Sequence, residues 1–473
     1  MSFRTLCMSR LSGELVLSED PVAQFTDTLT EIANQTIPKS HISKNKLPKV
    51  PWFNDVCKQA VKERKKAQRK LFRNPTAENV LAFKQLKAKA RHTIKTQKKA
   101  SWQNFCSSLR SKTKPKTVWK AIRKIKGKKS TSSLGHLKVN GKLLTDKKQI
   151  ANLLASTISN NSSSQHYSPK FQAIKKQHEK KPVKFTSDNT EDYNQPFSLL
   201  ELKQALQKSN DSAVGPDDIH YKLLTNLPES SLTLLLTVFN SIWESGIFPP
   251  SWREANIVAI PKPGKDSSDP NNYRPIALTS CLCKTMERMV NNRLMWVLES
   301  KGLLASEQCG FRKNRSTADH LVRFDSYIRN AFAKKEHVLA IFFDLEKAYD
   351  TTWKHGILSD LYDLDFRGHL PTFIDGFLSH QLFQVRAGPT LSDTYEQEMG
   401  VPQGSILSPV LFSLKINNIV KSVLKVSEAS LFVDDFALCI PPLWGAADAE
   451  IKVPSGENTQ LKRSPFKAWG GSV

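Results

Sequence analysis

Two adjacent carboxylates, Asp434 and Asp435, stand between two short apolar runs near the end of the chain. Apolar runs on both sides of a polar pair predict the arms of a β-hairpin, with both aspartates at its tight turn. Two carboxylates about 4 Å apart repel each other by about 4 kcal/mol at an effective dielectric of about 20. A hard divalent cation would offset that repulsion. The pair by itself fits either a metal site or a solvated turn.

A third carboxylate, Asp344, directly follows the unbroken apolar run 338–343. Such a run predicts a strand that is buried on both faces. A carboxylate at its end costs desolvation free energy unless it is paired or metal-bound, although Asp344 also suits a helix or turn cap. If this strand lies beside the Asp434–Asp435 hairpin, three carboxylates meet. That set suits two Mg²⁺ ions, which promote an in-line attack of a hydroxyl group on a phosphate.

Two loops offer groups that could hold the substrate of such a reaction. The segment 400–409 is rich in Gly and Pro before a predicted helix, so its backbone can approach a ligand closely. An ordinary connector between a strand and a helix is the alternative. Upstream, the loop at 260–276 carries Lys262, Lys265 and Arg274, which suit a triphosphate. Surface lysines are also commonly just solvated.

Positive charge is concentrated in one stretch of the chain. The net charge is +26, and residues 56–129 hold 25 Lys and Arg residues against two Glu residues, a balance of +23. Aromatic residues lie among these charges, and the composition favours helices with breaks at Asn74-Pro75 and Lys114-Pro115. Basic helices with aromatic residues are typical of binding to nucleic-acid phosphates. A solvated basic tail is the alternative interpretation.

The 473 residues suffice for two to four domains. We expect a poorly defined segment at 1–50, a basic helical arm at 51–155 and a flexible linker at 156–196. A compact α+β domain is predicted at 197–440, where Ser198 and Glu201 form a capping-box pattern. The tail 441–473 has no clear period, and we expect it to be disordered.

The seven cysteines form neither a disulfide framework nor a zinc pattern, which favours a reduced intracellular protein. Nucleus and cytoplasm are not distinguished by this argument. No apolar run reaches the roughly 18 residues needed to cross a bilayer, and no signal peptide is apparent. We therefore expect no membrane partner.

Five motifs in order identify a family that the chain resembles. They are the basic loop at 260–276, Gln308–Arg312, Phe342–Asp350, Gly400–Pro409 and Phe432–Asp435. Over about residues 197–440 the chain resembles the reverse transcriptase of non-LTR, LINE-type, jockey-like retrotransposons. The basic arm is similar to the segment that links endonuclease and polymerase in those elements. The resemblance implies a right-hand polymerase with fingers and a palm, built on a small antiparallel palm sheet and preceded by the basic helical arm.

The resemblance also implies the chemistry of the site. Asp344 and Asp434 would bind two Mg²⁺ ions, with Mn²⁺ as a substitute, and Asp435 would complete a catalytic triad. The backbone carbonyl of Leu345 would face a metal. The aromatic ring of Tyr349 would exclude a ribose 2′-OH by steric contact.

The remaining matched residues would contact substrates. Lys262 and Arg274 match residues that contact the incoming triphosphate, and Gln403 and Gly404 match the loop that positions nucleotide and template. The implied partners are an RNA template, a DNA primer, dNTPs and nucleic acid bound along 56–129. The implied reaction is the addition of dNTPs to a primer 3′-OH.

The chain departs from the family pattern at two places. Val433 replaces a small residue before the Asp pair, which we interpret as a mild change. After Ile440 we find no palm segment with a leaving-group Lys, no primer grip and no thumb, and too little chain precedes Val50 for an endonuclease. We therefore expect a truncated reverse transcriptase. A non-catalytic nucleic-acid-binding remnant is the alternative, and an RNA-directed RNA polymerase is disfavoured by Tyr349.

Overall fold

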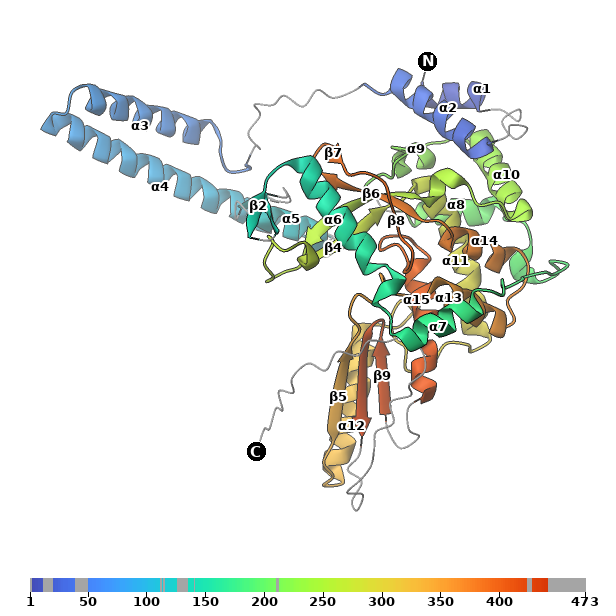
Figure 1. Cartoon of the computed structure of the whole chain (residues 1–473). Helices are drawn as coiled ribbons and strands as arrows, with labels where there is room; N and C mark the ends of the chain where they lie inside the picture. The colour runs from blue at the N-terminus through green and yellow to red at the C-terminus, as the bar shows by residue number, and fades with distance from the viewer. Residues whose placement is uncertain are drawn as a thin grey trace. The chain divides into compact units, whose positions relative to one another are not determined.

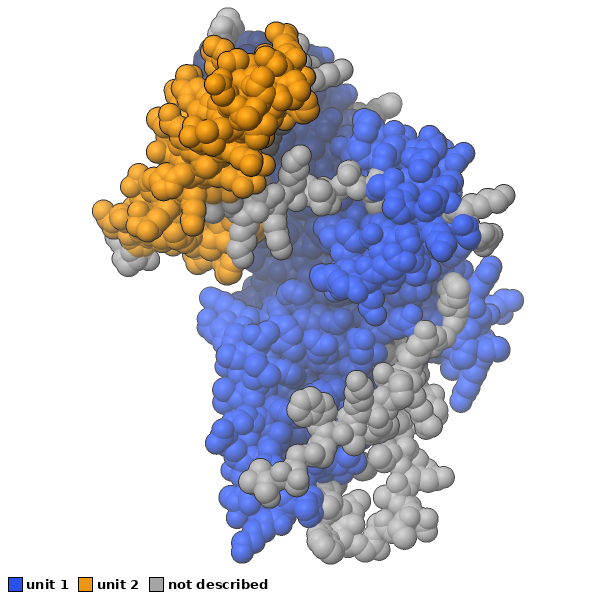
Figure 2. All heavy atoms as spheres, turned by 90° about the vertical axis from the view of Figure 1, so that its left-hand side faces the viewer, with its two compact units in different colours: residues 1–38, 133–473 blue, residues 39–132 orange. Residues whose placement is uncertain are grey.

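The computed structural model describes residues 2–11, 20–38, 50–110, 113, 115–125, 135–139, 141–209, 212–422 and 428–440. The chain divides into two compact units, one of residues 1–38 and 133–473 and the other of residues 39–132 (Figure 2). The predicted disordered tail at 441–473 lies outside the described residues.

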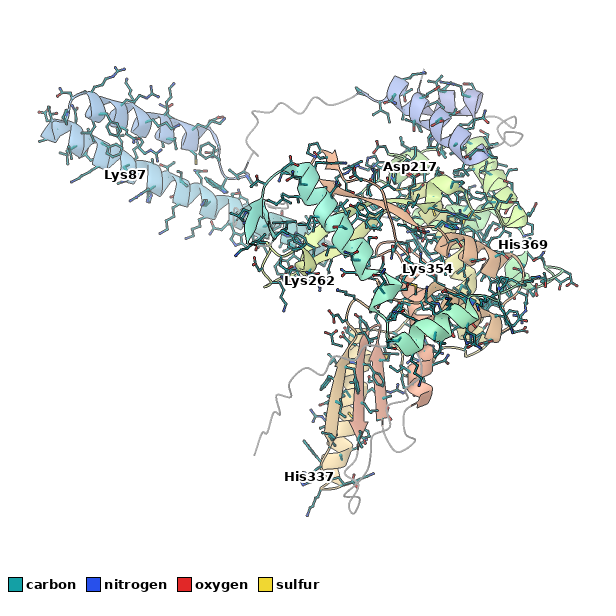
Figure 3. All side chains as sticks on the ribbon, viewed as in Figure 1. Lys87, Asp217, Lys262, His337, Lys354 and His369 are labelled. Atoms are coloured by element: carbon teal, nitrogen blue, oxygen red, sulfur yellow. The ribbon has the colours of Figure 1, made fainter. Side chains whose placement is uncertain are left out.

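The smaller unit is helical, as its composition predicts. It contains α3 (Asp55–Arg73), α4 (Ala77–Ser108) and α5 (Pro115–Ile125), and α3 packs along α4 (Figure 1). The predicted break at Asn74-Pro75 is confirmed, because Asn74 caps the end of α3 and the Thr76 side chain accepts a hydrogen bond from Asn79 N at the start of α4. Charged side chains such as Lys87 project into solvent (Figure 3). This unit ends at Ser132, short of the predicted boundary at 155.

The segment predicted to be a flexible linker is instead part of the larger unit. It overlaps α6 (Lys147–Asn161) and contains α7 (Pro169–His178). Ile158 lies in a hydrophobic core, and the Phe171 ring packs edge-on against Trp353 with 5.3 Å between centroids. The prediction failed because it rested on the Ser- and Asn-rich composition of this segment. The few apolar residues of the segment, such as Ile158 and Phe171, are spaced so that they pack against the larger unit.

The N-terminal segment is also ordered where it is described. It forms α1 (Phe3–Arg10) and α2 (Pro21–Thr36), whose buried residues join the main hydrophobic core. Val22, Phe25, Leu29 and Ile32 recur at helical spacing along α2. The expectation of a poorly defined segment overlooked this stripe.

Helices surround the main core of the larger unit. Buried Phe239, Trp243 and Phe377 are among its largest side chains. The predicted capping box is confirmed, because Ser198 and Glu201 exchange hydrogen bonds at the start of α8. The main-core helices are α8 (Leu199–Gln207), α9 (Tyr221–Thr225), α10 (Glu229–Ser245), α11 (Cys281–Ser300), α13 (Lys354–Asp363), α14 (His369–Leu378) and α15 (Ser408–Ile416).

A mixed sheet lies beside these helices, with the strand order β4-β3-β6-β7 and β8 paired to β6. β3 pairs antiparallel with β4 and parallel with β6, and α6 packs against β6 (Figure 1). A two-stranded hairpin of β1 (Leu137–Val139) and β2 (Lys142–Leu144) precedes α6. The strands of the mixed sheet are β3 (Glu254–Pro261), β4 (Tyr273–Leu278), β6 (Leu382–Ala387), β7 (Thr390–Leu391) and β8 (Tyr395–Glu396).

The second sheet is small and antiparallel, in the order β5 (Leu339–Asp344), β10 (Asp435–Ile440) and β9 (Glu428–Phe432). Helix α12 (Thr317–Ala333) packs against it, and Ser430 on β9 hydrogen-bonds His320 Nδ1 at 2.6 Å. The prediction that β5 is buried on both faces was wrong. Among the described strands β5 is an edge strand, and Phe342 on it is 69% exposed. An apolar run alone does not distinguish the two cases.

Among the described residues, every helix is too short or too polar to span a bilayer.

Candidate active site

The antiparallel register of the second sheet brings the three predicted carboxylates to one end of it. Asp344, the last residue of β5, lies directly opposite Asp435, the first residue of β10. Asp434 occupies the adjoining two-residue turn after β9. The predicted pairing of the strand with the hairpin is therefore present. One detail differs, because Asp435 begins a strand and only Asp434 lies in the turn.

The electrostatics of Asp434 reflect these neighbours. Its pKa is raised, chiefly by burial and further by the negative charges of Asp435 and Asp344. The positive charge of Arg274 acts in the opposite direction. Asp344 and Asp435 are themselves exposed. The site thus gathers negative charge near solvent, with one cationic side chain of β4 close enough to act on it.

This donor set suits a hard cation better than a soft one. All three side chains offer carboxylate oxygens, which Mg²⁺ prefers, and Mg²⁺ commonly binds through one or two carboxylates while water and phosphate oxygens fill its other positions. Within the described part of the chain, no cluster of three or more His, Cys, Asp or Glu side chains is arranged to hold a metal by itself. The oxygen chemistry of the three side chains fits Mg²⁺, and their role as its ligands stays a prediction.

The turn that carries Asp434 contains an unusual backbone conformation. Val433 has a φ of 62°, in the left-handed region, and its side chain is buried. This region costs an L-residue about 1–2 kcal/mol, and a β-branched residue is rarely found there. Our interpretation of Val433 as a mild change was therefore incomplete, because the position is conformationally strained.

The loop at 400–409 is held by backbone hydrogen bonds from several elements. Val401 N donates to Tyr349 O at 2.8 Å, and Ala277 N on β4 donates to Gln403 O at 2.7 Å. Gly404 has a φ of 132°, and a Cβ there would lie 2.5 Å from Ala277 O, so only glycine fits. The predicted loop is thus fixed between β4 and the segment after β5.

Gln403 also uses its side chain. Its Nε2 donates to Asp350 Oδ1 at 2.9 Å. Burial raises the pKa of Asp350 to about 6, while the Gln403 hydrogen bond and the charges of Lys347 and Lys262 lower it. Sequence reasoning quoted Asp350 within a motif but gave it no role. Its signal was a further aspartate six positions after Asp344.

A second residue that sequence reasoning missed is Glu287 on α11. It is fully buried, and its Oε2 accepts hydrogen bonds from Ile406 N at 2.7 Å and Leu407 N at 3.2 Å. Burial raises the pKa of this carboxyl. Glu287 therefore fixes the end of the loop just before α15. Its position among buried residues of an amphipathic helix was a signal that could have been read.

Tyr349 and Leu345 lie after β5 and pack against residues of α15 and of the turn at 433–434. The Tyr349 ring stacks on Phe412 of α15, with 4.9 Å between centroids and 19° between planes. Burial and the charge of Asp434 raise the pKa of Tyr349. Leu345 is buried in the same core cluster as Phe412 and Val433.

Two of the three predicted cationic residues, Arg274 and Lys262, lie on β4 and in the loop before it, and the third, Lys265, is exposed in the same loop. Arg274 is paired with Ile260 in the β3–β4 register, and Lys262 follows β3 directly (Figure 3). Lys262 N donates to Asn272 O at 2.8 Å, which closes the loop. Arg274 acts electrostatically on Asp434, and Lys262 acts on Asp350. Both residues therefore influence the acidic groups of the site.

Comparison with known proteins agrees with this geometry. Residues 260–442 match the family model described as reverse transcriptase (RNA-dependent DNA polymerase). This stretch of the chain is therefore similar to a reverse transcriptase domain. The matched residues of this domain run from the loop that contains Lys262 to the end of β10, and so include every predicted site residue.

Named relatives of the reverse transcriptase domain come from insect mobile elements. The probable RNA-directed DNA polymerase from transposon BS of Drosophila melanogaster is 33% identical over 220 residues, which cover 46% of this chain and 24% of that protein. The RNA-directed DNA polymerase from mobile element jockey of the same species is 33% identical over 218 residues, with the same two shares. The chain thus spans about a quarter of the length of these relatives. The predicted resemblance to jockey-like reverse transcriptases is confirmed.

Proposed function

We propose that this chain is the polymerase part of a mobile element and that it copies RNA into DNA by adding dNTPs to a primer 3′-OH. The observation that carries the proposal is the β5–β10 register, which sets Asp344 opposite Asp435 with Asp434 in the adjoining turn. This arrangement lies within the stretch that matches the reverse transcriptase family. The printed names of the relatives support the same activity.

Asp344, Asp434, Asp435 and the backbone carbonyl of Leu345 would hold two Mg²⁺ ions, or Mn²⁺ in their place. When bound, the ions would activate the attacking hydroxyl and neutralise charge on the leaving pyrophosphate. The exposure of Asp344 and Asp435 supports this assignment, because substrate oxygens must reach the same ions.

The remaining site residues would orient the nucleotide. Arg274 and Lys262 would contact its triphosphate. Their positive charges lower the pKa of Asp434 and of Asp350 respectively, which supports their placement near the site. Gln403 and Gly404 would place backbone close to nucleotide and template. Tyr349 would block the ribose 2′-OH, and stacking on Phe412 would hold its ring in place.

In this proposal the second sheet with α12 is the palm of a right-hand polymerase, and the β3–β4 hairpin belongs to the fingers. The basic residues at 56–129 would bind the nucleic-acid backbone without sequence preference. The exposed lysines of α4 support that role.

Primer extension on poly(rA)/oligo(dT) by the full chain tests the proposal. We expect dTTP incorporation that requires Mg²⁺ or Mn²⁺ and that the Asp434→Asn variant abolishes. Asp393→Asn, an exposed aspartate variant outside the site, is the matched control. Absence of extension by the wild-type chain, or full activity of Asp434→Asn, would overturn the proposal. Salt-dependent binding of nucleic acid without extension would instead support the non-catalytic remnant.

A further inference from the structure

The segment 307–310 packs against the hairpin that carries Asp434 and Asp435. Gln308 forms an isolated parallel bridge with Leu431 on β9. Cys309 N donates to Leu431 O at 2.9 Å, and Leu431 N donates to Glu307 O at 3.1 Å. These backbone contacts therefore hold the Cα of Gln308 beside the turn.

The Gln308 amide oxygen binds the backbone of the turn. Gln308 is fully buried, and its Oε1 accepts hydrogen bonds from Val433 N at 3.0 Å and from Gly310 N at 2.7 Å. Both partners are donors, so only the oxygen of the amide can face them. The Nε2 atom is left buried without a partner among the described residues. A residue that served only to fill space would not need an amide with an orphaned donor.

The strain at Val433 explains why the turn needs this acceptor. Val433 is the first central residue of the two-residue turn and has a positive φ, whereas Asp434 does not. This sign pattern is that of a type II′ turn, whose first central residue is usually glycine. A buried valine there is held against its own preference, and the Gln308 hydrogen bond to Val433 N stabilises that conformation.

Gly310 completes the contact. A Cβ at this position would lie 2.7 Å from Val433 N and 2.5 Å from Val433 Cγ2. Only a glycine therefore allows the segment to approach the turn closely enough for Gln308 Oε1 to reach both amides.

From these contacts we propose that Gln308 is a positioning residue that holds the left-handed turn at Val433 and thereby orients the Asp434 carboxylate toward Asp344. Gln308 touches neither substrate nor metal in this role. The inference rests on the proposed polymerase function for its kinetic consequence, but the hydrogen bond itself can be tested without activity.

The Gln308→Met variant tests the proposal, because methionine has similar size but offers no strong acceptor. We expect a fall in kcat of about 10-fold or more, a rise of several-fold in the Mg²⁺ concentration for half-maximal activity, and little change in KM for dTTP. Gln381→Met is the matched control, since Gln381 is also buried but its side chain hydrogen-bonds Phe377 O, outside the site. Equal kinetic losses in the two variants would overturn the proposal.

A suppressor distinguishes positioning from a general loss of stability. Glycine adopts a positive φ without strain, so adding Val433→Gly to Gln308→Met should recover several-fold of the lost kcat. Failure of the double variant to exceed Gln308→Met in kcat, at equal thermal stability, would contradict the proposed role.

Hydrogen exchange separates this proposal from the proposed function. We expect the Val433 amide to be protected in the wild-type chain and to lose protection in Gln308→Met, while the amides of β10 stay protected. If the wild-type chain does not extend primers but this pattern appears, the polymerase proposal fails and the positioning contact stands. Unchanged protection of Val433 in Gln308→Met would refute the contact.

Discussion

The loop at 400–409 and the turn at 433–434 belong to the same candidate site, and a buried polar side chain holds each of them, but they differ in how much charge they expose. The loop is fixed by buried polar groups, with backbone bonds to β4 and a fully buried Glu287 at its end. The turn lies at the end of a three-stranded sheet, where Asp434 is half-buried and the neighbouring Asp344 and Asp435 are exposed. The loop that is proposed to position nucleotide and template is therefore fixed by contacts within the protein before any substrate binds. The carboxylates that are proposed to hold metal carry negative charge, which a bound cation would offset.

The largest effect should come from the buried end of the loop. Glu287→Leu leaves the amides of Ile406 and Leu407 without an acceptor, so we expect the free energy of unfolding to fall by about 2–4 kcal/mol. Glu287→Gln keeps an acceptor oxygen and should retain most of the stability. Urea unfolding measures both variants, and equal losses would show that the carboxyl does not act through these two bonds.

The next effect concerns the buried charge at Asp350. Its pKa of about 6 lies above the ordinary 3.8, so the folded protein binds this proton more tightly than the unfolded chain does. The stability that this proton gives is present at low pH and is lost as the pH rises from about 4 to 6. Asp350→Asn should therefore be more stable than wild type at pH 7.5, by up to about 3 kcal/mol, and similar to it at pH 3.5.

Asp393→Asn provides a control of opposite sign. Asp393 is exposed, and hydrogen bonds from Lys148 and Asn152 lower its pKa. Asp393→Asn should therefore be less stable than wild type at pH 7.5, and this deficit should be smaller at pH 3.5. If Asp350→Asn shows the same trend as Asp393→Asn, the assignment of a destabilising buried charge to Asp350 is wrong.

A smaller effect is expected where the loop side meets the turn side, at the Tyr349–Phe412 stack. Phe412→Leu keeps much of the buried volume but removes the aromatic partner, which is worth about 0.5–1.5 kcal/mol. We expect the preference for dTTP over UTP to fall by about 3- to 10-fold, measured as a ratio of kcat/KM. Unchanged preference together with reduced stability would mean that Phe412 supports only the core.

The smallest effect should come from Asp435, the first residue of β10 after the turn. Asp435→Asn removes a repulsion between exposed or half-buried carboxylates, so we expect the free energy of unfolding to rise by less than about 1 kcal/mol in the absence of divalent cations. Added salt should reduce the difference by screening. A large loss of stability in this variant would erase the contrast between the loop and the turn.

The sequence predicted the parts of the site that depend on local pattern. The sequence analysis expected Asp344 to meet the hairpin if the two strands were neighbours, and the β5–β10 register fulfils that condition. Glu287 and Gln308 were not predicted to hold anything, since the amides of the loop and of the turn that they contact are more than 100 residues away in the sequence. The helical pattern around Glu287 indicates that this residue is buried, but it does not indicate which backbone amides the side chain contacts. The exposure of β5 was also missed, because burial depends on which neighbours a strand acquires.

The length of helix α4 can be compared with the spacing of phosphates in nucleic acid. Its 32 residues, at about 1.5 Å per residue, make a rod of about 48 Å. Phosphates along one strand of B-form DNA are about 3.4 Å apart, so this rod matches the span of about 14 nucleotides. A single basic helix is therefore long enough to lie alongside more than one full turn of a duplex.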